Sequence, residues 1–165
     1  MTMDSLILQA LRNSSLTEEL RDPEIEMLAQ CISVRDYKAG DSILKPGDTE
    51  LQDTLMILAS GDVEATASTG GEKVTLHLLK PGDLAGIIGF VGGNVMQVSV
   101  TIVAKTDSKV LLLERTRFEN LLNSQPAIVY YVMRGIVRNV HGIARRMNMQ
   151  SVEMSNYVYK QGARG

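Results

Sequence analysis

Five glycine-containing turns divide residues 32–114 into short segments, and their spacing limits the possible folds more than any other feature. Four turns carry a Gly-Asp pair and one a Gly-Gly pair, and their first glycines are Gly40, Gly47, Gly61, Gly70 and Gly82. Intervals of about 7 to 14 residues between them are typical of an antiparallel barrel or sandwich. Alternating apolar and polar residues in 63–67 and 74–78 predict strands with one buried face. We expect the glycines to form the barrel corners, because glycine adopts the positive φ angles of tight turns.

Helical patterns flank the predicted barrel on both sides. Residues 1–31 are expected to form an N-terminal helical cap, in which Asp22-Pro23-Glu24 predicts a helix start with Asp22 as its N-cap. Residues 115–150 predict C-terminal helices, the last of them long. Residues 151–165 lose the pattern and are expected to form a tail. The fold class is therefore mainly β with flanking helices.

Apolar residues of the long C-terminal segment follow a seven-residue repeat, in alternating steps of four and three. The members of this seam are Val129, Met133, Ile136, Val140, Ile143 and Met147. Such a repeat is typical of a helix that pairs with a copy of itself, and a parallel homodimer is the preferred interpretation. The alternative is that the seam packs against the chain's own barrel. A helix of ~45 Å, at about 1.5 Å per residue, would be longer than one small barrel, which favours the dimer.

Composition excludes several classes of protein. The chain has 165 residues, enough for one domain with a substantial core, and a net charge of −2, which offers no broad positive field to nucleic acid or to a membrane surface. Cys31 is the only cysteine, so no intramolecular disulfide can form. The sequence contains neither a membrane-spanning run nor a secretory signal, and no nucleophile elbow or phosphate-cradling loop. We expect a cytoplasmic protein that is not an enzyme.

Several motifs, taken in order, resemble those of a known family. They are Tyr37–Ile43 with Pro46-Gly47-Asp48, then Leu55–Glu64, Leu79–Gly86, Ala104–Asp107 and Arg117-Phe118-Glu119. Over about residues 16 to 150 the chain resembles the cyclic-nucleotide-binding domain of the catabolite-activator and FNR-type (CRP/FNR-like) bacterial regulators. The resemblance implies an antiparallel jelly-roll, or β-roll, over residues 32–114, and a role in signal transduction. Those regulators place a helix-turn-helix after the dimer helix; we expect none here, and no direct DNA binding by this chain.

The resemblance also implies a phosphate-binding cassette at residues 81–101, with a short helix at Leu84–Phe90 whose N-terminal amides face the ligand's phosphate. Family members that bind nucleotides add a Glu, an Arg and a Ser or Thr, and these positions hold Ile87, Val98 and Ser99 here. No Arg lies between Arg35 and Arg115. Loss of the Glu and Arg would remove ~3 to 6 kcal/mol, or roughly two to four decades of affinity. Tight cyclic-nucleotide binding is therefore not expected.

The pocket implied by the resemblance would be lined by aliphatic side chains and glycine backbone. Its candidate residues are Leu79, Gly86, Ile87, Ile88, Gly89, Val98, Ser99 and Ile143. Two functions remain open: a sensor of a different, less charged small molecule, or a domain with a filled pocket that serves as a dimerisation or docking scaffold. No cofactor or metal is expected. The nearest cations to the cassette are expected to be Lys80 and Lys105.

Overall fold

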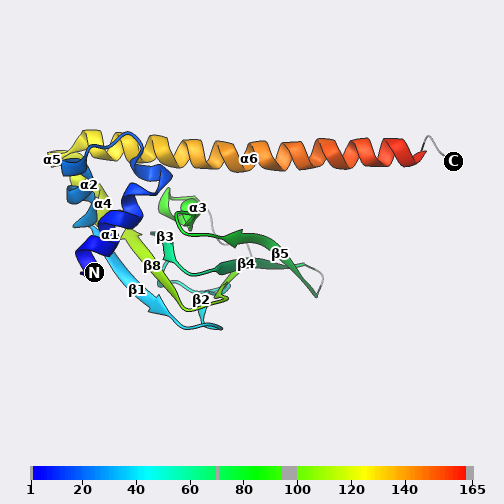
Figure 1. The fold of residues 1–165 in the computed structure, drawn as a ribbon, viewed down its shortest axis with the longest axis horizontal. Helices are drawn as coiled ribbons and strands as arrows, with labels where there is room; N and C mark the ends of the chain where they lie inside the picture. Colours follow the sequence, from blue (N-terminus) through cyan, green and yellow to red (C-terminus); the bar gives the residue numbers. More distant parts are fainter. Residues whose placement is uncertain (1, 70, 94–99, 163–165) are drawn as a thin grey trace.

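A computed structural model describes residues 2–69, 71–93 and 100–162. In this part of the chain, eight strands form two four-stranded antiparallel sheets (Figure 1), with the orders β1-β8-β3-β6 and β2-β7-β4-β5. Most neighbouring strands are distant in sequence, as in a jelly roll, and the predicted mainly-β fold with flanking helices is confirmed. The strands are β1 Ile32–Tyr37, β2 Ser42–Leu44, β3 Thr54–Ser60, β4 Val63–Thr69, β5 Glu72–Leu79, β6 Leu84–Ala85, β7 Val100–Ala104 and β8 Ser108–Glu114.

Helices lie at both ends of the chain, and one short helix lies between β6 and β7. They are α1 Met3–Arg12, the 3-10 turn η1 Ser15–Thr17, α2 Asp22–Ala29, α3 Ile87–Phe90, α4 Arg115–Glu119, α5 Leu121–Ser124 and α6 Pro126–Gly162. The N-cap of α2 is Arg21, not the expected Asp22. The cap moves one residue earlier because the Glu24 carboxylate accepts a hydrogen bond from the Arg21 N–H at 3.1 Å, which satisfies a donor at the helix start.

Three of the predicted turns share one local structure, built on a Lys-x-Gly-Asp sequence. The glycine has a φ of 91° at Gly40, 88° at Gly47 and 95° at Gly82, so the prediction that these glycines form turns is confirmed. In each turn the backbone N–H of the lysine donates a hydrogen bond to the side-chain carboxylate of the aspartate three residues later. The pairs are Lys38 with Asp41 at 2.8 Å, Lys45 with Asp48 at 2.9 Å and Lys80 with Asp83 at 2.9 Å.

Two strands, β3 and β8, are buried on both faces, which explains their continuous apolar sequences. Their alternate residues point into two separate cores. Leu55 and Leu113 belong to an outer core between this sheet and the helices, which also contains Leu16, Phe90 and Val132. A second, inner core lies inside the β-roll and contains Met56, Leu58, Val63, Leu79, Ile102, Val110 and Leu112. The described part of the cassette therefore lies between the outer core and the inner core.

The last helix, α6, is the longest element, with 37 residues. It crosses the helical end of the domain and continues far past the body (Figure 1). Residues 151–162 continue this helix, where the sequence pattern led us to expect a tail. No Pro or Gly interrupts residues 143–161, so nothing in this stretch stops the helix. None of the helices described is both long and apolar enough to cross a membrane.

Candidate functional site

The cassette segment begins as a strand and turns into a helix at Gly86. Leu84 and Ala85 pair with Ile57 and Met56 of β3, so the helix does not start at Leu84 as expected. Gly86 has a φ of +79°, which ends the strand, and α3 begins at Ile87. The cassette helix is thus only four residues long, Ile87–Phe90.

Gly86 is required by close packing as well as by its backbone angle. A Cβ atom at this position would lie 2.6 Å from the carbonyl oxygen of Thr54. At the other end of α3, Phe90 is 2% exposed, and its ring lies 5.5 Å from the ring of Phe118 in α4, measured between centroids. The cassette helix is therefore held tightly between β3 and the C-terminal helices.

The predicted pocket residues that the structure describes lie in different surroundings. Leu79 is 6% exposed and lies in the inner core, whereas Ile87 packs against the outer core. Gly89 is buried, and Ile88 is 50% exposed at the surface. Ile143 is 38% exposed on α6. Val98 and Ser99 lie outside the described residues.

The inner-core side chains of the described residues line a small cavity inside the β-roll. The cavity that the described residues leave there has a volume of about 10 Å³, close to the space needed for one water molecule. Its walls include Leu79 and Val110 of the inner core and Ala85 and Asp83 of the cassette. Within the described part of the cassette, the space is apolar and too small for a nucleotide.

Arg115 contacts the described part of the cassette, and the sequence analysis missed this residue. Its Nη1 lies 3.4 Å from the carbonyl oxygen of Gly89, and its Nη2 lies 3.3 Å from the Asp53 carboxylate. Its Nε is 3.8 Å from Glu119. Arg115 therefore joins α3, the start of β3 and α4, and its charge is balanced by two carboxylates. No sequence spacing indicates this contact, because 26 residues separate Arg115 from Gly89.

The two lysines expected near the cassette are engaged in ion pairs. Lys80 Nζ lies 3.1 Å from the Asp62 carboxylate, and Lys105 Nζ lies 3.1 Å from the Glu64 carboxylate. The hydrogen bonds from Lys105 and from the Thr75 hydroxyl lower the pKa of Glu64 and keep this carboxylate ionised. Neither lysine is therefore an unpaired cation that could replace the missing Arg.

The seven-residue seam of α6 has two different environments. Ile136 is 2% exposed in the single chain, and Val129 and Met133 pack partly against the outer core. This part of the seam fits the alternative interpretation, in which the helix packs on its own domain. Further along, Val140 is 45% exposed and Ile143 is 38% exposed. The side chain of Met147 lies outside the described ones.

Comparison with known proteins assigns the family. The sequence profile of the cyclic nucleotide-binding domain matches residues 34–125, more than half of the chain. The chain therefore belongs to the cyclic nucleotide-binding domain family, as the motif order indicated. Regulatory domains of this family share this fold, and the family match therefore supports a regulatory role for the chain.

Individual relatives are distant in sequence. The chain is 27% identical to human cGMP-dependent protein kinase 2 over 133 residues, which are 79% of this chain and 17% of the kinase. It superposes on the crystal structure of the Thermus thermophilus catabolite activator protein with a TM-score of 0.67 at 26% identity, covering 84% of this chain and 63% of that one. A cyclic nucleotide-binding domain from Methylobacillus flagellatus gives a TM-score of 0.74 at 19% identity, with 87% and 79% covered, and supports the fold alone. The chain thus spans less than a fifth of the kinase's length.

Proposed function

We propose that this protein is a non-catalytic, cytoplasmic regulatory module of the cyclic nucleotide-binding family whose phosphate cassette does not bind cyclic nucleotides tightly. The observation that carries the proposal is the absence of any arginine from residues 36–114, which include every residue of the cassette and all strands after β1. Arg115 does not compensate, because Asp53 and Glu119 already pair with it. A cyclic phosphodiester in this cassette would be left without the charge-assisted contacts that stabilise a bound anion.

Calorimetric titration of the protein with cyclic AMP and cyclic GMP tests this proposal. We expect no saturable binding below ~10 μM, because two charge-assisted contacts are worth roughly two to four decades of affinity. The variant with both Ile87→Glu and Val98→Arg is the gain-of-function comparison and should bind more tightly. Its melting temperature must be measured as well, because Ile87 packs against the outer core. Submicromolar binding by the unmodified protein would overturn the proposal.

A second candidate function is a docking or dimerisation scaffold that binds no small molecule. The observation that favours it is the cavity of about 10 Å³ inside the β-roll. A panel of apolar and weakly acidic metabolites in a thermal-shift assay separates the two functions. A ligand-dependent rise in melting temperature supports a sensor, since ligands that bind only the folded state stabilise it. No shift with any ligand supports the scaffold.

We also propose that the protein forms a homodimer through the part of α6 that begins at Val140. Support comes from the seven-residue repeat and from the exposed apolar side chains that α6 carries beyond the body. Those that lie on the repeat are Val140, Ile143 and Met154. Because Ile136 is already 2% exposed in the single chain, it adds little to such an interface. This narrows the interface predicted from the sequence to its C-terminal half.

The variant Val140→Glu is expected to be monomeric on a sizing column at concentrations where the unmodified protein is a dimer. The substitution would bring two carboxylates together in an apolar seam, where unpaired charges are strongly unfavourable. Val152→Glu is the matched control: Val152 is also exposed, at 59%, but lies off the seven-residue repeat. An elution volume that Val140→Glu leaves unchanged would contradict the interface.

A further inference from the structure

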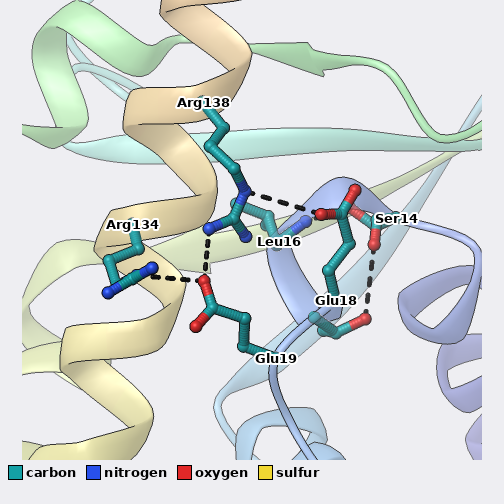
Figure 2. A network of polar contacts seen from close by, with 7 residues as sticks. Ser14, Leu16, Glu18, Glu19, Arg134 and Arg138 are labelled. Atoms are coloured by element: carbon teal, nitrogen blue, oxygen red, sulfur yellow. Dashed lines mark hydrogen bonds and ion pairs between the residues drawn. The ribbon is translucent and has the colours of Figure 1, made fainter.

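Four charged side chains join η1 and the residues after it to α6 (Figure 2). The Nε of Arg134 lies 3.0 Å from the Oε1 atom of Glu19, and Nη1 of Arg138 donates to the same oxygen. The Nε of Arg138 is 3.5 Å from the Glu18 carboxylate. Arg134 also donates to the Tyr130 hydroxyl at 3.2 Å, which holds its guanidinium on the surface of α6. We call Glu18, Glu19, Arg134 and Arg138 the acid–base cluster.

The cluster lies at the last turn of α6 that is attached to the domain. Beneath it, Leu16 and Val132 are fully buried, and Gly135 brings the helix backbone close to η1. A Cβ on Gly135 would lie 2.9 Å from the Ser15 carbonyl oxygen. Only two residues beyond Arg138, Val140 is 45% exposed. The apolar contacts therefore anchor α6 up to Ile136, and the charged contacts mark the end of the attached region.

The bonding of Arg138 is incomplete. Among the residues described, its buried Nη2 atom has no hydrogen-bond acceptor, and its buried Nε atom makes only the ion-pair contact with Glu18 at 3.5 Å, without a hydrogen bond. Such unpaired buried donors weaken a contact, since water would satisfy them once the side chain is released. The side chains of Arg138 and Glu19 are also 38% and 27% exposed, so dissolved salt can screen their attraction. Incomplete hydrogen bonding and partial exposure together leave these ion pairs weak enough to open.

Burial would by itself raise the pKa of Glu19. The hydrogen bond from Arg138 and the positive charges of Arg134 and Arg138 outweigh burial and lower this pKa below its usual value. The carboxylate is therefore ionised at neutral pH, and ionic strength is the appropriate variable for testing the contact.

We propose that the acid–base cluster is a releasable latch that fixes the point at which α6 leaves the domain. When the latch opens, the side chains of Arg134 and Arg138 leave Glu18 and Glu19 and the helical turn of residues 134–139 becomes more mobile, while the buried side chains of Val132 and Ile136 stay packed on the domain. Because the proposed interface begins at Val140, the latch also sets the direction in which α6 presents its exposed seam. In this respect the inference rests on the proposed self-association.

Amide hydrogen exchange of the 165-residue chain tests the latch. Glu19→Gln, Arg138→Gln and the double variant are compared with the unmodified protein at low salt. Each single variant should speed exchange of the amides of residues 134–139 about three- to fivefold. The double variant should speed it by less than the product of the two single effects, because the contact between Glu19 and Arg138 is lost in all three variants. Raising the salt concentration should remove the difference. Arg145→Gln is the matched control, because Arg145 lies on the same helix and forms no ion pair with the described residues.

Two results would overturn the latch. One is that Arg138→Gln changes exchange at residues 134–139 no more than Arg145→Gln does. The other is that faster exchange spreads evenly through α2 and β8, which would indicate a general loss of stability. Amides of residues 152–160 report separately on self-association, so a failed latch and a failed dimer can be told apart.

Discussion

Gly86→Ala is expected to lower the free energy of unfolding by about 2 to 5 kcal/mol. Alanine in the left-handed conformation at a φ of +79° costs about 1 to 2 kcal/mol. The new Cβ would also lie 2.6 Å from the Thr54 carbonyl oxygen, and overpacking of this kind costs about 1 to 3 kcal/mol. Denaturation by urea, monitored by circular dichroism, measures the change.

Gly47→Ala is the control that separates these two costs. Gly47 has nearly the same backbone angle, with a φ of 88°, but a Cβ there would meet nothing within 4 Å. We therefore expect a loss of only about 1 to 2 kcal/mol. If both variants lose the same stability, close packing of Gly86 against β3 does not constrain the cassette.

Alanine substitutions at two glycines of α6 are expected to change stability in opposite directions. Gly142→Ala should stabilise the protein by up to about 1 kcal/mol, because alanine favours helix and no atom lies within 4 Å of the new Cβ. Gly135→Ala gains the same propensity, but its Cβ would lie 2.9 Å from the Ser15 carbonyl oxygen and 3.0 Å from the Leu16 Cα. Overpacking against this backbone should leave a net loss of about 1 to 2 kcal/mol.

Thermal unfolding followed by calorimetry measures both α6 variants under the same conditions. Equal stabilisation by the two substitutions would show that α6 can move away from η1 without cost. In that case α6 would pack only loosely against the N-terminal helices, and the acid–base cluster would not hold α6 in a fixed orientation.

The features that could be predicted from sequence are those determined by neighbouring residues. Gly40, Gly47 and Gly82 were predicted as corners because a turn is specified within four residues. The Asp three residues after each lysine closes the same turn by a local hydrogen bond. The motif order was likewise sufficient to identify the family, although no single motif was.

The features that the sequence could not reveal depend on tertiary contacts between distant segments. Arg115 reaches the cassette only because β8 ends beside α3, and Glu19 meets Arg138 across 119 positions of the chain. The seven-residue repeat also did not reveal that the seam has a buried part and an exposed part. Ile136 and Val140 have the same apolar character, but η1 and the outer core cover only the first.

The length of α6 beyond the latch gives the domain a mechanical property. From Arg138 to Gly162 the helix extends ~36 Å at about 1.5 Å per residue, and Figure 1 shows it as a single straight rod. A tilt of about 10° at its attached end would carry the far end through about 6 Å, by the same geometry. Rearrangements smaller than one side chain near η1 are thus amplified, by lever action, into a displacement larger than a helical turn at the tip.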